Sequence, residues 1–357
     1  MNVLFLNSHY YLPQTHGGIA NTIHQLATGL MELGHNPSVL NSLRNDGDAF
    51  TLKARIKIKA NRALRGVDAC RDDAFAYPVW RSWDIMASLE GVIRQARPDI
   101  IVVVGGKIVP VTNAARAFGI PIVTQVHDVE FQWHGGDFAS IVDLPCVANS
   151  HFTARAYQSA FGLDACVIYP FIQLEQYRVA ERGEKVVFIN PLKRKGLRKA
   201  IDIARALPNI DFLFVGGIEP SESGQECAQT AVSQLPNVEV APFRSDMKSV
   251  YAQCKVLLVP SQWEETYGRV INEAQVSGIP ALASNIGGLP EAVDEGGVLL
   301  DPQADTRVWA RELETMMSDE DHYDVLSRRA LQSVGRPKLQ AEHQLKEHEN
   351  LLLAAIR

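Results

Sequence analysis

The stretch that decides the fold is VPSQWEETYGRVINEAQVSGIPALASNIGGLPE, residues 259–291. It begins at the end of an apolar run that predicts a buried strand, and Pro260 ends that strand. A loop carrying two glutamates follows, and a helix is predicted to start near Gly268. A second predicted strand then closes on a glycine-rich turn at 286–291. The polar residues therefore gather at strand carboxyl ends and at a helix amino end, where α/β sheets bind ligands.

Composition limits the classes of protein that remain. The chain has 357 residues, enough for two domains, and its 46% hydrophobic and 21% charged residues are typical of a globular protein. A net charge of −6 argues against a nucleic-acid binder. The five cysteines lack CxxC spacing, which favours reduced thiols in the cytoplasm. The N-terminus lacks the basic leader of a signal peptide, and no apolar run reaches the roughly 18–20 residues of a membrane span.

Strands and helices alternate twice along the chain. In the first half, predicted strands at 3–6, 37–40, 99–104, 121–126, 143–148 and 167–171 alternate with helices that include 19–33 and 151–161. In the second half, strands are predicted at 185–189, 212–215, 238–241 and 256–259, with a helix at 246–254 before the last. This alternation predicts an α/β protein of two doubly wound, Rossmann-like domains that face one another across a cleft.

A polar passage at 171–184 is typical of an interdomain linker. We therefore predict one domain at 1–170 and another at 185–337. A final helix at about 338–357 is predicted to pack back on the first domain, and a place on the second domain is the alternative.

Two features of the first half suggest a ligand site. Gly17-Gly18 at a helix start would let backbone N–H groups approach an anion closely, although a simple tight turn is the alternative. The pair is not a GxGxxG fingerprint, so a nicotinamide site loses support. His127 follows a strand and precedes Asp128, a good position for a site, whereas a core or capping histidine is the usual alternative.

Three cations, Lys193, Arg194 and Lys195, follow the first strand of the second half and open a helix. Cations at the end of a strand, next to helix amides, form the kind of cradle that phosphate sites use. A surface loop is the alternative. Position and charge agree, so we favour the cradle.

Glu265 and Glu273 have seven residues between them. At roughly 1.5 Å per helical residue, eight steps span about 12 Å at most, the length scale of a nucleoside diphosphate sugar. One carboxylate would hold ribose hydroxyls and the other sugar hydroxyls, with the helix start at Gly268–Arg269 aimed at the phosphates. Two surface glutamates are the alternative. Glu264 is interpreted as a solvated neighbour.

Residues 52–65 form a basic run inside an acidic protein. Its cations are Lys53, Arg55, Lys57, Lys59, Arg62 and Arg65. They predict a basic amphipathic helix that lies on anionic lipid or faces an anionic acceptor, with an ordinary solvated helix face as the alternative.

Taken together, these motifs resemble the E-x7-E region and flanking loops of the retaining glycosyltransferases of family four, which have the GT-B fold. The central motifs are Pro260-Ser261, Glu265, Gly268, Glu273-Ala274, Gly278-Ile279-Pro280 and 287–291. Further matches are Gly17-Gly18, Gly34-His35, Val126-His127-Asp128, Gly216 and the run 250–261. The resemblance covers essentially the whole chain, and implies an acceptor-side N-terminal domain and a nucleotide-sugar-binding C-terminal domain.

The resemblance also implies roles for individual residues. Glu265 would hold hydroxyls of the donor sugar, Glu273 those of the ribose, and Lys195 would neutralise the diphosphate. His127 would lie against the donor sugar near the reacting carbon. His127, Glu265 and Lys195 are thus the candidate catalytic residues.

Other positions complete the implied donor site. Gly17 and Gly18 would lie close to the phosphate and the acceptor, and the main chain at Phe243–Arg244 would meet the base. The remaining donor-site residues are Asn190, Arg194, Gly216, Tyr267, Gly268 and Arg269. One departure matters: the family usually has Gly-Arg-Leu before the lysine, whereas this chain has Asn190-Pro191-Leu192, so Arg194 or Lys193 would have to replace the missing arginine.

The reaction implied is transfer of a hexose-type sugar with retention of anomeric configuration. The nucleoside diphosphate sugar is a co-substrate, UDP is preferred over GDP, and no cofactor is expected. No metal is expected either, because no Asp-x-Asp motif stands where a donor phosphate would need one. The acceptor would be a glycan, a glycolipid or a small molecule, and the enzyme cytoplasmic, with peripheral contact to the inner face of an anionic membrane through 52–65.

Two other functions are compatible with the same fold. A nucleotide-sugar isomerase of the 2-epimerase type would turn over the donor without any acceptor. A non-catalytic sugar-nucleotide-binding subunit would keep Glu273 and lose the histidine, and His127 is present.

Overall fold

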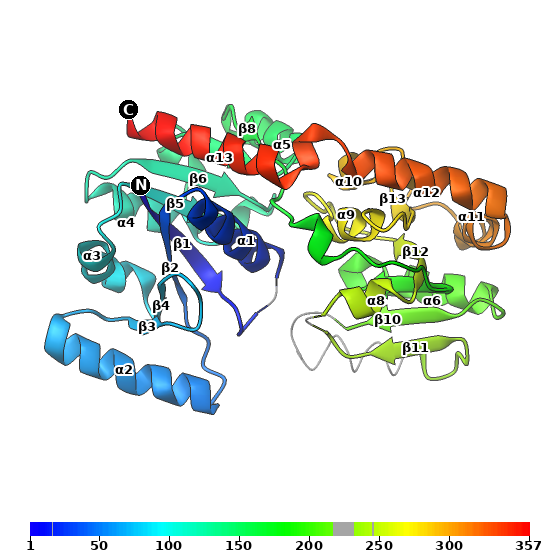
Figure 1. Cartoon of the computed structure of the whole chain (residues 1–357), viewed down its shortest axis with the longest axis horizontal. Coiled ribbons are helices and arrows are strands. Elements are labelled where there is room, and N and C mark those ends of the chain that lie inside the picture. Colours follow the sequence, from blue (N-terminus) through cyan, green and yellow to red (C-terminus); the bar gives the residue numbers. More distant parts are fainter. Residues whose placement is uncertain (16, 217–231, 245) are drawn as a thin grey trace. The chain divides into compact units, whose positions relative to one another are not determined.

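The structure is a computed structural model that describes residues 1–15, 17–216, 232–244 and 246–357 (Figure 1). The chain divides into two compact units. The first comprises Met1–Phe171 together with Glu342–Arg357, and the second comprises Ile172–Ala341. Each unit is a Rossmann-like α/β domain built on one largely parallel sheet.

The first unit has a sheet in the order β3-β4-β2-β1-β5-β6-β7-β8, in which only β3 is antiparallel to its neighbour. Its strands are β1 (Asn2–Tyr10), β2 (Asn36–Ser42), β3 (Cys70–Asp72), β4 (Val79–Ser82), β5 (Ile100–Val104), β6 (Ile122–Val126), β7 (Cys146–Ala148) and β8 (Cys166–Val167). Its helices are α1 (Gly18–Glu32), α2 (Ala49–Arg65), α3 (Ile85–Ala96), α4 (Ile108–Arg116), α5 (His151–Phe161) and the short η1 (Phe131–His134) and η2 (Phe138–Ile141).

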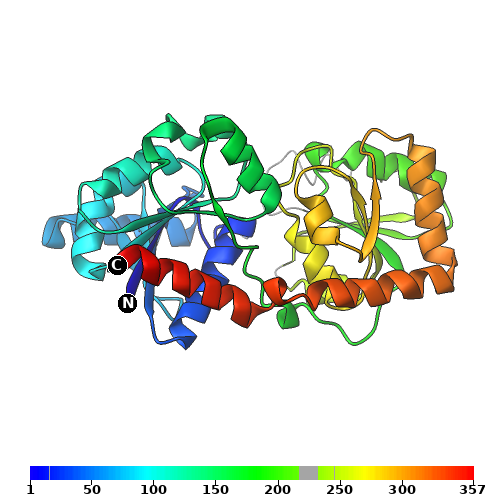
Figure 2. The same cartoon turned by 90° about the horizontal axis from the view of Figure 1, so that it is seen from above.

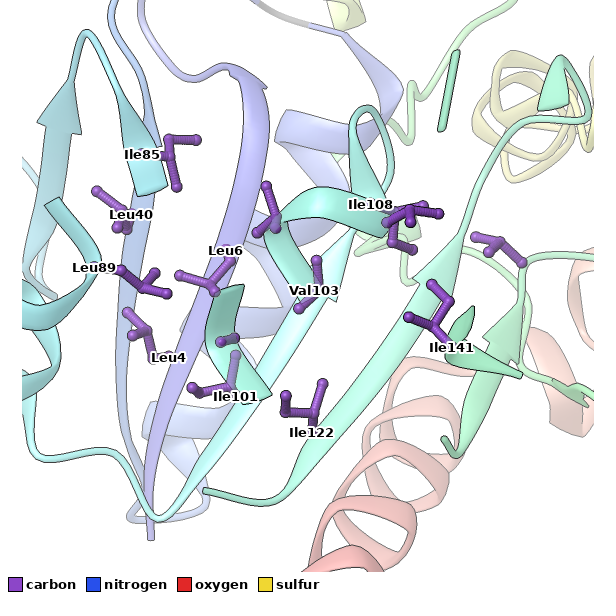
Figure 3. Close-up of a cluster of buried hydrophobic side chains, with 14 of the residues drawn as sticks. Leu4, Leu6, Leu40, Ile85, Leu89, Ile101, Val103, Ile108, Ile122 and Ile141 are labelled. Atoms are coloured by element: carbon purple, nitrogen blue, oxygen red, sulfur yellow. The ribbon is translucent and has the colours of Figure 1, made fainter. Parts of the chain in front are cut away.

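The core of the first unit explains why its strands are almost continuously apolar. Leu4 and Leu6 of β1 lie beside Ile101 and Val103 of β5 in parallel register, and all four are buried (Figure 3). Helices cover both faces of a parallel sheet, so each strand loses its polar face. Burial of each such side chain contributes roughly 1.5–3 kcal/mol.

The second unit has a six-stranded parallel sheet in the order β11-β10-β9-β12-β13-β14. Its strands are β9 (Lys185–Ile189), β10 (Phe212–Val215), β11 (Val238–Ala241), β12 (Cys254–Val259), β13 (Ala281–Ser284) and β14 (Gly297–Leu300). Its helices within the described ranges are η3 (Leu174–Gln176), η4 (Lys193–Lys195), α6 (Leu197–Ala206), α8 (Lys248–Tyr251), α9 (Arg269–Gln275), α10 (Leu289–Val293), α11 (Thr306–Ser318), α12 (Glu320–Val334) and η5 (Pro337–Leu339). The chain reverses its direction of winding between β9 and β12, so the ligand crevice of a doubly wound sheet is expected at their carboxyl ends.

The last helix, α13 (Ala341–Ile356), packs on the first unit (Figure 2). Gln344 donates hydrogen bonds from Nε2 to the carbonyl oxygens of Tyr169 and Pro170, at 3.4 and 3.3 Å. A Cβ at Gly29 of α1 would lie only 3.1 Å from Leu345 Cδ1, so the glycine is what lets α13 approach α1.

The structure departs from the sequence-based prediction in several segments. Strand β1 continues to Tyr10, which pairs with Ser42, whereas the predicted strand ends at Leu6. The predicted helix 246–254 is wrong at both ends, because α8 covers Lys248–Tyr251 and Cys254 already belongs to β12. The predicted strand 167–171 stops at Val167, since β8 pairs only with β7.

The irregular stretch 45–84 contains α2, β3 and β4. The short strands β3 and β4 extend the sheet beyond β2, and three or four residues carry too little periodicity to identify a strand. Gly217, expected to complete a turn with Gly216, and Cys227 lie outside the described residues. The other four cysteines carry free thiols. Across the described ranges, no helix is long and apolar enough to cross a membrane.

Candidate functional site

The predicted cation cradle lies at the switch point of the second unit. Lys195 follows β9 and Glu265 follows β12, and these two strands are neighbours in the sheet. The Nζ of Lys195 lies 2.5 Å from Oε2 of Glu265, and the two side chains are only 17% and 7% exposed. A cation and a carboxylate predicted separately are therefore one ion pair at the place where this fold binds ligands.

Glycine at position 196 makes this approach possible. Gly196 has φ +86°, and a Cβ there would lie 1.9 Å from the carbonyl oxygen of Pro260. The loops are also joined by a backbone hydrogen bond of 2.9 Å from the N–H of Gln262 to the carbonyl oxygen of Arg194. Any larger residue would strain the backbone and push the two loops apart.

Trp263 was missed in the sequence, although it stands between two quoted motifs. Its ring lies under two cations, with the guanidinium carbon of Arg194 at 4.5 Å from the ring centroid and Nζ of Lys195 at 5.2 Å. An aromatic face attracts cations within about 6 Å. Lys193 is exposed on the same 3-10 turn. Arg194 therefore shares its platform with Lys195, which favours it over Lys193 as the second cation.

Glu265 is buried with one oxygen available. Its Oε2 is paired with Lys195, whereas its Oε1 is buried and has no hydrogen-bond partner among the described residues. A buried carboxylate oxygen without a donor is costly unless a ligand supplies one. Glu264 beside it is exposed, as predicted for a solvated neighbour.

The glycine-rich turn at 286–291 packs against the backbone of the loop that contains Glu265. The N–H of Gly288 donates to the carbonyl oxygen of Glu265 at 2.6 Å. A Cβ at Gly287, which has φ +61°, would lie 2.4 Å from the same oxygen. The turn at 286–291 therefore holds the backbone that presents Glu265.

Glu273 lies on α9 in a different environment. Its Oε2 accepts a hydrogen bond of 2.9 Å from the hydroxyl of Tyr251, and its Oε1 lies 3.5 Å from Nε of Arg269. Burial raises the pKa of the Glu273 carboxyl, and the charge of Arg269 opposes that shift. Glu273 and Arg269 therefore face each other, a pairing that was not predicted from the sequence.

Helix α9 begins after Glu265, whereas the distance estimated from the sequence treats Glu265 and Glu273 as residues of one helix. It covers Arg269–Gln275, with Gly268 as its N-cap at φ +94°. Glu265 therefore lies in a loop, and the helical rise applies only from Arg269 onward, so the 12 Å figure does not measure the separation of the two glutamates. Tyr267 is buried and donates its hydroxyl to Oδ1 of Asn272 at 2.6 Å.

Three further predicted residues lie at carboxyl ends of the same sheet. Asn190 follows β9 with φ +64°, a left-handed conformation that asparagine tolerates better than most residues. Gly216 follows β10, and a Cβ on it would lie 3.4 Å from the backbone N of Phe243, which follows β11. The structure thus brings Gly216 and the main chain of Phe243 together.

In the first unit, Gly17 and Gly18 begin α1. Gly17 is the N-cap, with an extended backbone at φ −64° and ψ 159°, and Gly18 is the first helical residue. Within the part of the chain that the structure describes, no side chain caps this helix start, which leaves the first-turn amides oriented outward from the helix.

His127 follows β6 directly and is half-buried. Its neighbour Asp128 is held by a buried network: Nε2 of His134 lies 3.0 Å from Oδ1 of Asp128, and the Tyr157 hydroxyl donates to the Asp128 carbonyl oxygen at 3.1 Å. The Tyr157 hydroxyl also lies 2.8 Å from Nε2 of His134. His134 and Tyr157 were not identified from the sequence.

His348 of α13 is a second residue that sequence analysis missed. Burial and, to a smaller extent, the neighbouring His127 lower its pKa to about 4. Nothing in the spacing of α13 distinguishes His348 from an ordinary core residue, since only the packing of that helix brings it toward His127.

The fold defines a class of protein: two Rossmann-like domains that follow one another in the sequence, as in glycosyltransferases of the GT-B fold. Residues 16–176 match the family model described as Glycosyltransferase Family 4. Residues 172–333 match the model described as Glycosyl transferases group 1. Together these matches support a glycosyltransferase of the family-four type, in agreement with the resemblance given above.

Individual proteins are similar over parts of the chain. The D-inositol 3-phosphate glycosyltransferase of Nocardia farcinica is 31% identical over 216 residues, which are 52% of this chain and 47% of that protein. The protein of the same description from Corynebacterium urealyticum is 34% identical over 166 residues, 42% of this chain and 38% of that protein. The matches thus span less than half the length of these relatives.

Solved structures are similar over nearly the whole chain. HepE of Anabaena in complex with UDP has a TM-score of 0.74 at 18% identity, covering 99% of this chain and 100% of that one. Sucrose-phosphate synthase of Thermosynechococcus elongatus has a TM-score of 0.77 at 17% identity, with coverage of 99% and 100%. At these identities the likeness establishes the fold.

Proposed function

We propose that this protein is a retaining glycosyltransferase that moves a hexose-type sugar from a nucleoside diphosphate sugar to an acceptor without a metal ion. The observation that carries the proposal is the ion pair of the half-buried Lys195 with the buried Glu265 at the switch point of the second unit. One of these residues suits a diphosphate and the other suits sugar hydroxyls. Such a pair has no evident purpose in a sheet that only needs a stable core, because buried charges are expensive.

Lys195 and Arg194 would hold the diphosphate. Both lie over Trp263, which limits the conformations of two otherwise flexible side chains. When the donor binds, Lys195 would contact the leaving phosphate while Glu265 turns its available Oε1 to a sugar hydroxyl. Cations already oriented toward the leaving group stabilise the charge that develops on it.

The reaction breaks the bond between the anomeric carbon and the diphosphate oxygen, and its electron pair leaves with the nucleoside diphosphate. The acceptor hydroxyl oxygen forms the new bond on the same face, and its proton is released with the leaving group. Glu273 is assigned the ribose hydroxyls, His127 the donor sugar, and Gly17 and Gly18 the phosphate and acceptor, all on the family resemblance.

The descriptions of similar proteins suggest a donor nucleotide and an acceptor for this chain. Proteins similar to this chain are described as D-inositol 3-phosphate glycosyltransferases, and HepE, which shares the fold, has been seen with UDP and with UDP-glucose. We therefore propose UDP over GDP as the donor nucleotide. A glycan, a lipid-linked glycan or a small molecule would accept the sugar, in the cytoplasm or at the inner face of a membrane.

A thermal-shift panel of nucleoside diphosphates and their sugars tests the donor site, because a ligand that binds the folded state raises the melting temperature. We expect UDP and a UDP-sugar to stabilise the protein. At a ligand concentration of about 100 times Kd the gain is about 2.7 kcal/mol. If every diphosphate, UDP included, leaves the melting temperature unchanged, the donor-site assignment fails.

Two assays separate the alternatives. Conversion of a UDP-sugar to its 2-epimer without acceptor would identify an isomerase. Donor binding with no turnover, across a panel of inositol phosphates, glycans and lipid-linked sugars, would identify a binding subunit.

A further inference from the structure

We infer that α2 is a membrane-docking helix whose outer face binds the surface of an anionic bilayer. The inference goes beyond the proposed reaction, because no residue of α2 belongs to the donor site. The helix lies at the edge of the first unit, next to β3 (Figure 1).

The inner face of α2 fixes the helix in place. Thr51, Ala54 and Ile58 are its buried residues. Ala54 and Ile58 pack in a small cluster with Leu43 and Cys70. Because one face is committed to the fold, the opposite face has a defined orientation toward solvent.

Both ends of the helix are also well defined. Oδ1 of Asp48 accepts a hydrogen bond of 2.8 Å from the N–H of Thr51, which caps the start. Gly66 ends the helix with φ +63°, and Asn61 donates from Nδ2 to the carbonyl oxygen of Ala69 at 2.9 Å. The helix is therefore a preformed surface that needs no folding on binding.

The outer face carries an apolar stripe. Leu52, Ile56, Ala60 and Ala63 follow one another at steps of four, four and three residues, which places them on one side of a helix. Leu52 is 58% exposed and Ile56 62% exposed. The stripe lies opposite the buried face, so nothing in the first unit covers it among the described residues.

Cations border the stripe on both sides. At about 100° per residue, Arg55, Lys59 and Arg62 fall along one edge, and Lys53 and Lys57 along the other. Leu64, which is 82% exposed, lies beside the second edge. Arg62 is partly neutralised by Asp68, with Nε and Oδ1 at 3.0 Å, whereas α2 itself contains no carboxylate.

The charge of this helix contrasts with the rest of the protein. Six cations in 52–65 give the segment a charge of +6, while the whole chain carries −6, so the remaining residues carry −12. A soluble anionic partner would need only the cations. A stripe of exposed leucine and isoleucine between two rows of cations fits a bilayer surface, where the apolar residues enter the interface and the cations meet anionic headgroups.

Sedimentation with vesicles tests the inference on the full chain. With phosphatidylcholine vesicles that contain about 30% phosphatidylglycerol we expect the protein to sediment, and with pure phosphatidylcholine we expect little binding. Reversal of two charges, Lys57→Glu with Lys59→Glu, should lower the partition coefficient by roughly 30-fold or more, since each basic residue contributes roughly a factor of five. The double change Leu52→Ser with Ile56→Ser should also lower it, on the same vesicles.

Matched controls separate this surface from bulk charge and hydrophobicity. Arg307→Glu with Arg311→Glu makes the same charge change on exposed positions of α11, and Val308→Ser with Val325→Ser removes exposed apolar side chains elsewhere. Both controls should sediment like the unmodified protein. All four variants alter exposed positions, and circular dichroism together with the UDP thermal shift verifies that each one folds and that its donor site is intact.

Three outcomes would overturn the inference. The first is no sedimentation with anionic vesicles. The second is equal loss of binding in the α11 control, which would show a bulk charge effect. The third is retention on heparin without vesicle binding, which would indicate a soluble polyanion. A protein that binds vesicles and ignores every nucleotide would leave docking intact and remove the proposed reaction instead.

Discussion

The two units of this protein have similar sheets but carry different chemistry at their strand carboxyl ends. In the second unit, the loops after β9 and β12 place Arg194 and Lys195 over the Trp263 ring and pair Lys195 with Glu265. In the first unit, His127 and Asp128 follow β6, and Asp128 is held by His134 and Tyr157. Each sheet presents the carboxyl ends of its parallel strands, and the side chains on the loops that follow these strands determine what each sheet can bind.

The two units also differ in whether their buried ionisable side chains are charged or neutral. The second unit keeps a half-buried cation, Lys195, facing the buried carboxylate of Glu265, a costly arrangement that a dianionic ligand would use. The first unit holds His348 in its neutral form by burial. We therefore expect changes in the second unit to alter donor turnover, and changes at His348 to alter the pH dependence of stability.

The largest effect is expected for Lys195→Ala. Loss of a cation that stabilises the leaving group should lower kcat/KM by about 10³-fold. Steady-state kinetics with a UDP-sugar and a competent acceptor measures it. Arg198→Ala is the control, because Arg198 follows on the same segment with its side chain 86% exposed. A change of Lys195→Ala that leaves turnover within threefold of the control would remove the cradle from the proposal.

Glu265→Gln should have the next largest effect. The charged hydroxyl acceptor is lost while the shape is kept, so kcat/KM should fall by roughly 10²-fold. UDP lacks the sugar, and its affinity should therefore stay the same or rise as Lys195 is released. Calorimetry with UDP and with a UDP-sugar distinguishes these effects, and equal weakening of both ligands would contradict the sugar role.

His348→Gln should change stability and its pH dependence. The pKa of His348 is lowered by burial from 6.5 to about 4. Below pH 6.5 the unfolded chain takes up a proton that the folded protein does not, so stability is lost as the pH falls from 6.5 toward 4. At pH 5 this amounts to about 2 kcal/mol.

Thermal unfolding between pH 5 and 7.5 measures this slope. The His348→Gln curve should be flatter than that of the unmodified protein, whatever its absolute stability. His343→Gln, which changes an exposed histidine of α13, is the control and should keep the original slope. Parallel curves for His348→Gln and the unmodified protein would show that this histidine is not held neutral.

Trp263→Leu should have the smallest effect. A cation–π contact contributes roughly 0.5–2 kcal/mol, so KM for the donor should rise by about 5- to 10-fold with little change in kcat. Trp263→Phe should recover part of the loss, and Trp83→Leu, at an exposed indole in the first unit, should leave KM as it is. If Trp263→Phe is as poor as Trp263→Leu, the platform role is wrong and the tryptophan serves only packing.

Much of the fold could be predicted from the sequence. The helix 151–161 was predicted at its observed bounds, and the strands around Val259 and Ser284 nearly so, because their apolar periods and flanking glycines are local signals. The short edge strands β3 and β4 gave no such signal, since their pairing with the sheet is what makes them strands. The helix before β12 was predicted too long, because residues 252–254 are locally compatible with a helix or a strand. Pairing within the sheet places Cys254 in β12.

The candidate site, like the fold, was predicted only in part from the sequence. Lys195 and Glu265 were identified one by one, from their positions after strands and from the family motif. Their mutual contact, and the place of Trp263 under the two cations, depend on β9 and β12 being neighbours. His348 could not be found at all, since only the docking of α13 on the first unit brings it toward His127.

The sequence by itself determined the two α/β repeats, the cations and glutamates at their strand ends, and the basic character of 52–65. These are properties of neighbours along the chain, set by side-chain period, glycine and charge. Only the tertiary structure decided which strands adjoin, which oxygen of Glu265 has no donor among the described residues, and which stripe of α2 faces outward. Those depend on long-range pairing and burial, which select one arrangement among many that local preference allows.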